Sequence, residues 1–318
     1  MNPSVKFLKI IGNGPRSSRD YTYQEAFDLM SLLIFEKAFS RENLGALFLL
    51  MRRKTTTKDE IKGFLDAWEQ AYPSPFKPFN TRSLLVSSPF DGKKRSVYLS
   101  PLVAGLLQEA GIPVVVGGAR GIGPKYGLTE RDLFSSENPF LQNIPLSLEN
   151  YPVLWDACEL YSFYEELISS RNEVGLRSFL HTIEKLLNPY GATHAILTLH
   201  HEPYVGRYFY AMEGRIENVT LVFGEEGTSD ICWKRPTRYI RKIGQKKVEG
   251  FIDPKEWGLP KLDTHRPGGL KETSLFWEKA LKDKGSSENI WVQAQQSFFK
   301  FALGEGDSPF DIFQKENS

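Results

Sequence analysis

The sequence predicts an α/β protein in which a helical N-terminal part precedes a mostly parallel central sheet. Residues 20 to 71 carry apolar side chains at helical spacing. From Ser83 onwards, short apolar runs rich in valine and isoleucine alternate with helical stretches. This alternation is typical of parallel strands joined by right-handed crossovers. With 318 residues, the chain is long enough for about two domains.

Three helices are expected in the N-terminal part. Thr22 with Glu25 and Thr57 with Glu60 form capping-box patterns, in which hydroxyl and carboxylate satisfy the free N–H groups at a helix start. An apolar-striped helix from residue 40 to 53 lies between them. The proline-rich segment 72–78 is then a stiff connector, because proline restricts the backbone. We expect a helical domain over residues 1–72 and an α/β domain over residues 80–318.

The α/β part is expected to begin with a strand, a helix and a second strand. The helix starts with Ser100 as N-cap and Pro101 as its first residue, and Gly111 ends it. Continuous apolar runs predict strands at 83–86, 112–116, 195–199 and 219–223. Helices are expected over most of 152–187 and at 202–212, 274–281 and 289–303, whereas residues 310–318 are expected to fray.

Composition limits the compartment and the partners. The 40 basic and 39 acidic residues give a net charge of +1, so net charge alone does not predict nucleic-acid binding. The two cysteines, Cys158 and Cys232, are too few for a disulfide framework and are expected to be reduced. The N-terminus lacks a signal-peptide pattern, and no apolar run approaches the roughly 20 residues of a membrane span. We therefore expect a cytoplasmic protein that does not enter membranes.

The most informative segment for function is Ser87 to Arg95, between the first strand and the helix at Ser100. A helix N-terminus attracts anions, and Lys93, Lys94 and Arg95 add three adjacent cations. The alternative is a solvated turn at 91–92 with surface lysines. We expect that replacing all three cations with alanine leaves the fold intact, because a charged turn contributes little to a core.

Three further segments are candidates. Residues 117–123 follow a buried strand, where open α/β sheets bind ligands; the alternative is a flexible connection. Residues 224–230 place carboxylates after another strand, where they could hold Mg²⁺ or simply be solvated. Adjacent histidines His200 and His201 point to opposite sides of a strand and cannot easily share one metal ion, so a place in a ligand cleft is favoured.

Several of these segments, taken in order, carry a family resemblance. Met51 to Thr55 joins two N-terminal helices, and residues 171–178 and 187–189 follow with the spacing of known motifs. Together they resemble the anthranilate phosphoribosyltransferase family from about residue 8 to 303. The resemblance implies the phosphoribosyltransferase class II fold, shared with nucleoside phosphorylases, with about 150–190 returning to the helical domain. It also implies a cleft for phosphoribosyl diphosphate with Mg²⁺, and matches Arg177 to the family's acceptor-binding arginine.

A homodimer through the helical domains is implied as well. The sequence supports it independently, because a three-helix unit cannot hide all of its phenylalanines. The residues concerned are Phe27, Phe35, Phe39 and Phe48.

The chain departs from the family where the chemistry occurs. The family's Gly-Thr-Gly-Gly-Asp-Gly loop corresponds to residues 87–92, which keep only Asp91 and Gly92, and Pro89 removes a backbone donor. The Lys-His-Gly-Asn-Arg motif keeps a glycine and the arginine, Arg120. The Asp-Glu metal pair becomes Ser229-Asp230. Because these groups support departure of pyrophosphate, we expect no ordinary anthranilate transfer.

Two functions remain open from the sequence, beside a third reading as a purely structural paralogue. The first is a binder of a phosphate-bearing ligand, with nucleic acid as the candidate, as in a divergent branch of the family that resembles nucleic-acid binders. The alternative is an active phosphoribosyl or glycosyl transferase with a different acceptor. The expected phosphate-binding residues are Ser88, Asp91, Gly92, Lys93, Lys94, Arg95, Ser100, Gly118 and Arg120. The expected cleft residues are Arg177, His200 and His201, and any Mg²⁺ would fall to Asp230 and Glu226.

Two basic clusters support the nucleic-acid candidate. The first combines Lys93 to Arg95 and Arg120 with Lys125 and Arg207. In the second, Trp233 and Tyr239 are interleaved with cations, and aromatic stacking with backbone neutralisation suits single strands. Its cations are Lys234, Arg235, Arg238, Arg241, Lys242, Lys246 and Lys247.

Overall fold

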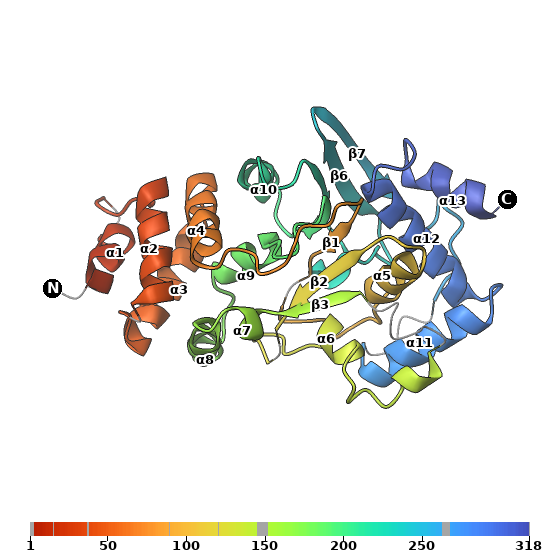
Figure 1. Ribbon diagram of the computed structural model, residues 1–318, viewed down its shortest axis with the longest axis horizontal. Helices are drawn as coiled ribbons and strands as arrows, with labels where there is room; N and C mark the ends of the chain where they lie inside the picture. Colours follow the sequence, from red (N-terminus) through yellow and green to blue (C-terminus); the bar gives the residue numbers. More distant parts are fainter. Residues whose placement is uncertain are drawn as a thin grey trace.

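The helical N-terminal part lies at one end of the molecule, and the sheet lies between it and the C-terminal helices, within residues 270–317, at the other end (Figure 1). The computed structural model describes residues 3–14, 16–36, 38–88, 90–119, 121–144, 152–262 and 268–317. The N-terminal helices are α1 (Pro3–Gly12), α2 (Tyr23–Phe35), α3 (Arg41–Lys54) and α4 (Lys58–Ala71). Both predicted capping boxes are confirmed, at Thr22 for α2 and Thr57 for α4, and Ser40 caps α3.

A seven-stranded sheet forms the centre of the rest of the described chain, with strand order β3-β2-β1-β4-β5-β6-β7. The strands are β1 (Leu84–Val86), β2 (Val114–Gly118), β3 (Val153–Asp156), β4 (His194–Thr198), β5 (Asn218–Val222), β6 (Thr237–Ile243) and β7 (Lys246–Ile252). The first five strands in this order are mutually parallel, and β6 and β7 are antiparallel. The predicted α/β fold with a mostly parallel sheet is confirmed.

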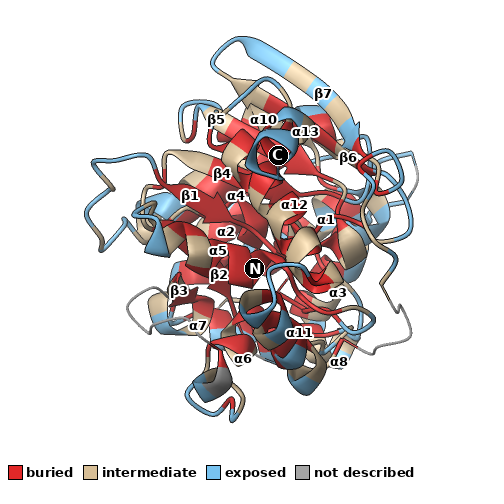
Figure 2. Ribbon diagram, turned by 90° about the vertical axis from the view of Figure 1, so that its right-hand side faces the viewer, coloured by how far each residue is buried: buried red, intermediate tan, exposed pale blue. Residues whose placement is uncertain are grey.

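Helices cover both faces of the sheet. After β1 these are α5 (Ser100–Glu109), α6 (Glu130–Leu133), α7 (Ala157–Leu160), α8 (Tyr164–Val174), α9 (Leu180–Ile183), α10 (Tyr204–Met212), α11 (Leu270–Lys282), α12 (Ser287–Ala302) and α13 (Pro309–Asn317). Successive residues of β1 face opposite ways, as the period of a strand requires. Leu84 and Val86 join the cluster under α5, α11 and α12, and Leu85 joins the cluster shared with the helical part. Figure 2 shows β1, β2 and β4 in the buried centre of the molecule, whereas β7 is largely exposed at its periphery.

The segment predicted to return to the helical part does lie against it. α8 contacts α3, and α9 contacts α4. The ring of Phe179 lies 4.8 Å from that of Phe64 in α4 and 6.2 Å from that of Phe48 in α3. Apolar packing therefore runs without interruption from the N-terminal helices to one face of the sheet.

Several elements differ from the sequence predictions. β3 lies inside the stretch expected to be mostly helical, β6 and β7 were not predicted, and neither was α1. Residues 310–318 do not fray over their described part, because α13 packs its apolar side against the chain: Phe313 stacks on Trp257 at 5.4 Å. In β6 the charged residues hid the strand, since Arg238, Arg241 and Lys242 interrupt its apolar residues.

Candidate functional site

The loop that follows β1 lies at the carboxyl edge of the parallel strands. Ser88 and Asp91 are almost completely buried there, each at 1% exposure. Gly92 has a φ of 71°, and a Cβ atom at this position would lie 2.4 Å from the carbonyl oxygen of Gly127. Glycine is therefore required at residue 92 both by the backbone angle and by the close approach of the chain. The adjoining Pro89 lies outside the described residues.

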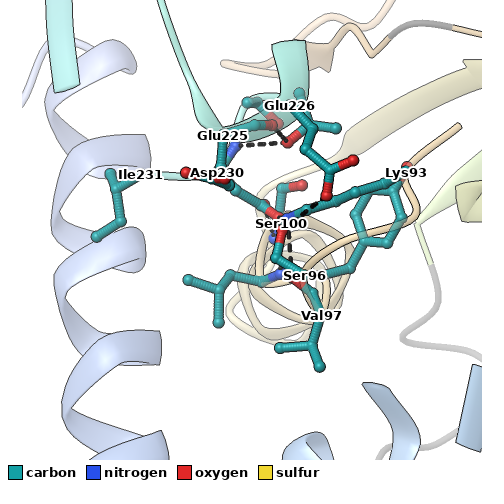
Figure 3. A network of polar contacts seen from close by, with 12 residues as sticks. Lys93, Ser96, Val97, Ser100, Glu225, Glu226, Asp230 and Ile231 are labelled. Atoms are coloured by element: carbon teal, nitrogen blue, oxygen red, sulfur yellow. Dashed lines mark hydrogen bonds and ion pairs between the residues drawn. The ribbon is translucent and has the colours of Figure 1, made fainter. Parts of the chain in front are cut away.

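Lys93 points into the protein (Figure 3). Its Nζ lies 2.5 Å from Oδ2 of Asp230 and donates to the carbonyl oxygen of Val97 at 2.8 Å. Neither side chain of the ion pair is exposed to solvent, whereas Lys94 and Arg95 are exposed. The expectation that all three cations form a charged turn outside the core is therefore wrong for Lys93, because pairing with Asp230 draws it inside.

Asp230 also caps helix α5. Its carboxylate accepts the N–H of Ser100 at 2.6 Å and that of Leu99 at 3.2 Å. The prediction that Ser100 is the N-cap is wrong: Leu99 holds that position, and the buried Ser100 hydroxyl has no hydrogen-bond partner in the described part of the chain. A carboxylate at this place satisfies free N–H groups and faces the positive end of the helix dipole.

Glu226 contacts the same loop. Its Oε2 accepts the N–H of Lys94 at 3.1 Å, and its Oε1 accepts the N–H of Arg95 at 2.7 Å and the Ser96 hydroxyl at 3.0 Å. The Glu226 side chain is only 2% exposed. Burial opposes its ionisation, but the backbone donors and the charge of Lys93 lower the pKa of Glu226 overall, so the carboxylate is ionised at neutral pH.

The two carboxylates expected to hold Mg²⁺ thus have other partners. Asp230 is bound by Lys93 and the start of α5, and Glu226 by donors of the loop. Mg²⁺ requires free oxygen ligands in nearly octahedral geometry. Within the described ranges, no group of three or more His, Cys, Asp or Glu side chains could hold a metal ion. The residues present at Asp230 and Glu226 therefore do not fit Mg²⁺.

Asp91 connects the loop to the arginine expected in the cleft. Arg177 donates to Oδ2 of Asp91 through Nε at 3.1 Å and Nη2 at 3.0 Å, and Nζ of Lys125 lies 3.5 Å from Oδ1. Burial lowers the pKa of Lys125, and the nearby Asp91 carboxylate partly offsets this effect. The structure brings Asp91 and Arg177 together from positions 86 residues apart.

A pocket of about 300 Å³ adjoins Arg177. It lies among the α3–α4 junction, the segment from 177 to 185 and the segment from 199 to 208. No carboxylate occurs among the described residues that line it. The polar and aromatic side chains of the lining are Arg52, Arg177, Lys185, His181, His200, His201, Tyr204, Tyr208 and Phe179, together with three threonines and a serine.

The pocket is electropositive, and its titratable groups reflect this. Burial, with Arg177 nearby, lowers the pKa of Lys185 to about 8, and its Nζ donates to the carbonyl oxygen of Thr198 at 2.9 Å. Burial, followed by the charges of Lys185 and Arg177, lowers the pKa of His200 to about 4. At pH 7 the pocket therefore presents cationic lysine and arginine beside a neutral His200.

Sequence reasoning assigned Arg177, His200 and His201 to the cleft, and all three line the pocket. It missed Arg52 and Lys185. Arg52 lies in a quoted motif, Met51 to Thr55, but nothing there marks it as a ligand contact. Lys185 occurs in a stretch with helical periodicity, where a cation is ordinarily a surface residue.

Other predicted site residues lie elsewhere. Gly118 is the buried last residue of β2, and a Cβ there would lie 3.8 Å from Cγ of Arg131. Arg120 lies outside the described residues. The neighbouring Gly117 packs directly on the ring of Trp155, where a Cβ would come within 2.2 Å. Close packing on Trp155 therefore accounts for the glycine at residue 117 of this pair.

The second basic cluster does not offer its aromatic rings to a ligand. Tyr239 is 5% exposed and packs edge-on against Phe301 at 5.1 Å, and Trp233 stacks on Trp291 at 5.8 Å. Arg241 is buried and donates to the carbonyl oxygen of Phe301 at 2.6 Å. The prediction that Tyr239 stacks on nucleic-acid bases is therefore wrong, because Tyr239 belongs to the core, and Trp233 is partly buried against that core. Exposed cations of the cluster are Lys234, Arg235, Lys246 and Lys247.

Known proteins share this fold and sequence over nearly the whole chain, although no family model matches. An uncharacterised protein of Aquifex aeolicus is 28% identical over 295 residues, covering 91% of this chain and 90% of the relative. An anthranilate phosphoribosyltransferase of Caldicellulosiruptor saccharolyticus is 22% identical over 303 residues, covering 91% and 86%. The anthranilate phosphoribosyltransferase structure from Thermus thermophilus superposes with a TM-score of 0.74 at 21% identity, covering 99% of this chain and 93% of that one.

Over nearly the whole chain, the sequence is similar to anthranilate phosphoribosyltransferases and the fold is the one that they adopt. A further structure of this fold, from Saccharomyces cerevisiae, was solved in complex with phosphoribosyl diphosphate and magnesium; its TM-score is 0.73 at 13% identity, covering 98% of this chain and 92% of that one. In the described part of this chain, helices long and apolar enough to cross a membrane are absent.

Proposed function

We propose that the protein binds a phosphate-bearing ligand in the pocket beside Arg177 and does not perform ordinary anthranilate transfer. One observation carries the proposal: the pocket is lined by Arg52, Arg177 and Lys185 and by no carboxylate among its described lining residues. Such a site attracts anions, and arginine suits phosphate because its planar group donates two parallel hydrogen bonds.

Nucleic acid is the ligand we favour. Tyr204 lines the same pocket as the cations, and its ring is accompanied by the guanidinium of Arg207 at 4.8 Å. Cations that neutralise a backbone, combined with an aromatic ring for a base, are the usual components of a single-strand site. Since the aromatic rings of the second basic cluster pack on the core, Tyr239 buried and Trp233 partly buried, this pocket replaces it as the proposed place of contact.

Magnesium is not required in this proposal. The Saccharomyces cerevisiae structure contains phosphoribosyl diphosphate together with magnesium. Here the carboxylates at the corresponding loop are bound to Lys93 and to backbone donors. Without a metal to neutralise departing pyrophosphate, transfer loses a main source of electrostatic assistance.

The alternative is a phosphoribosyl or glycosyl transferase that uses another acceptor. It is supported by the Asp91–Arg177 contact, which keeps the loop and the pocket adjacent. The two functions differ in one measurement. A transferase consumes phosphoribosyl diphosphate in the presence of its acceptor, whereas a binder leaves it unchanged.

The test compares two adjacent arginines. Arg52 lines the pocket, whereas Arg53 is exposed and does not. Titration of a fluorescent single-stranded oligonucleotide, and calorimetry with phosphoribosyl diphosphate with and without Mg²⁺, are expected to show binding that Arg52→Ala weakens and Arg53→Ala leaves unchanged. The slope of log affinity against log salt should flatten by about 0.7 per lost phosphate contact on a single strand. The proposal is refuted if neither ligand binds, or if Arg52→Ala and Arg53→Ala have equal effects.

A further inference from the structure

Glu226 places a carboxylate where the loop after β1 would otherwise receive an anion. The N–H groups of Lys94 and Arg95 and the hydroxyl of Ser96 all donate to its two oxygens, at 3.1, 2.7 and 3.0 Å. Figure 3 shows Glu226 and Ser96 close to Ser100 and Lys93 in one network. Successive backbone N–H groups in a turn form a concave anion site, and a carboxylate and a phosphate use such donors in the same way.

These donors cannot serve two anions at once. Each backbone N–H has a single hydrogen, and the Glu226 side chain is only 2% exposed, so no external group reaches the donors while Glu226 is in place. The network also contains a buried hydroxyl group that could form a further hydrogen bond. The hydroxyl of Ser100 is 1% exposed and has no hydrogen-bond partner among the residues that the structure describes.

We propose that Glu226 is an internal competitor that occupies the anion site of residues 94–96, and that a phosphate group enters this site only when Glu226 leaves it. The inference rests on the proposed function, because the phosphate belongs to the ligand of the neighbouring pocket. The site at 94–96 is then a second phosphate subsite, closed in the structure described here.

The turn that carries Glu226 is joined to the pocket on two sides. Gly227 has a φ of 82°, and a Cβ atom there would lie 2.0 Å from Nε2 of His200, a residue of the pocket wall. Nζ of Lys125 donates to the carbonyl oxygen of Glu226 at 3.3 Å and lies 3.5 Å from Asp91. Since Asp91 in turn binds Arg177, a ligand that pulls on Arg177 or displaces His200 acts on the turn directly.

The backbone of the turn is suited to movement. Glu226 itself has φ 49° and ψ 17°, a left-handed conformation that an ordinary side chain adopts at some energetic disadvantage. The hydrogen bonds of its carboxylate offset that disadvantage. A phosphate that takes over those hydrogen bonds would therefore release Glu226 to a more favourable backbone conformation.

The experiment measures the affinity of the full chain for inorganic pyrophosphate by calorimetry. Glu226→Gln removes the charge that competes, and Glu226→Asp keeps the charge but shortens the side chain by one methylene, which withdraws it from the loop. The matched control is Glu225→Gln, which removes a carboxylate from the same turn, whereas the N–H groups of Lys94 and Arg95 donate to Glu226. Both Glu226 variants are expected to bind pyrophosphate at least tenfold more tightly than the unmodified protein and the control.

Combination with Arg52→Ala separates this inference from the proposed function. If the Glu226 variants gain affinity and the gain survives Arg52→Ala, the subsite stands and the proposed use of the pocket falls. If binding depends on Arg52 but neither Glu226 variant changes it, the proposed function stands and Glu226 is not a competitor. Should Glu226→Gln fail to fold, as judged by circular dichroism, the result of Glu226→Asp decides.

Discussion

Lys93 and Asp230 form an ion pair that is completely buried, although their positions are 137 residues apart. The pair links the loop after β1 to the segment between β5 and β6, and Asp230 extends the link to the first N–H groups of α5. An isolated buried charge is far less stable than a paired one. Removing either partner therefore affects the whole carboxyl edge of the sheet.

We predict that Lys93→Ala lowers the free energy of unfolding by about 3 to 5 kcal/mol, because it leaves the Asp230 charge buried and unpaired. Lys94→Ala is the matched control. Its side chain is exposed and its backbone N–H is retained, so a change within about 0.5 kcal/mol is expected. Urea unfolding measures both. Equal effects of the two variants would contradict the buried pair, and the sequence-based expectation that all three cations could be replaced harmlessly would be restored.

Ligand affinity should depend on pH through Lys185. Its pKa of about 8 means that it is charged at neutral pH and loses its charge as the pH rises through about 8. The affinity for a single-stranded oligonucleotide is therefore expected to fall between pH 7 and 9. In Lys185→Met the affinity should be lower by roughly tenfold or more at pH 7, the usual contribution of a charged hydrogen bond, and flat over this range. An unchanged pH profile in the variant would exclude Lys185 from the site.

Stability should depend on pH through Glu130. Burial raises the pKa of Glu130 to about 7, although the Ser88 hydroxyl acts in the opposite direction. A carboxyl group with a raised pKa holds its proton in the folded state, so its contribution is fully present below the unfolded pKa and is lost as the pH rises through about 7. The shift corresponds to about 3 kcal/mol.

Urea unfolding at pH 5 and pH 8 tests this. Glu130→Gln, which stays neutral, is expected to reduce the fall in stability between these pH values by that amount. Glu213→Gln, which removes an exposed carboxylate, should leave the fall as it is in the unmodified protein. If both variants follow the unmodified protein, Glu130 is ionised at neutral pH.

We predict a homodimer through the N-terminal helices, with Phe35 in the interface. Of the four phenylalanines that suggested a dimer, Phe39 and Phe48 are buried within the chain, but Phe35 is 67% exposed. Phe35→Glu is expected to shift sedimentation towards the monomer at micromolar concentration. Phe251→Glu, at an equally apolar exposed position on β7, should leave the dimer intact. A monomer at every concentration in the unmodified protein would refute this prediction.

Much of the fold could be predicted because interactions between residues close in sequence determine where helices start and which apolar runs become strands. Thr22 and Thr57 mark helix starts through hydrogen bonds to residues three positions away, and the apolar runs of β1, β4 and β5 are buried on both faces. The strand β6 was not predicted because its Arg241 is buried, with the guanidinium over the ring of Phe301. This contact cannot be inferred from the sequence of β6 alone.

The site could be predicted less well, because its contacts join residues that are far apart in the sequence. The sequence pointed to the loop of Asp91 and to His200, and the resemblance added Arg177, but the contact between Asp91 and Arg177 spans 86 residues and could not be predicted. The burial of Lys93 and the hydrogen bonds of Glu226 depend on partners more than 130 residues away. The sequence around residues 93–95 therefore gave no indication that Lys93 is buried whereas Lys94 and Arg95 are exposed.

The strand β7 has a consequence for how copies of this chain can assemble. It is the last strand of the sheet order, and Lys246, Lys247 and Glu249 are exposed along it. An edge strand with unpaired backbone groups can pair with a strand of a neighbouring chain. Lysines along such an edge oppose this pairing, because it would bury their charges. Extension of the sheet from one molecule into the next is thereby disfavoured at this end, so growth into fibrils by edge pairing is suppressed.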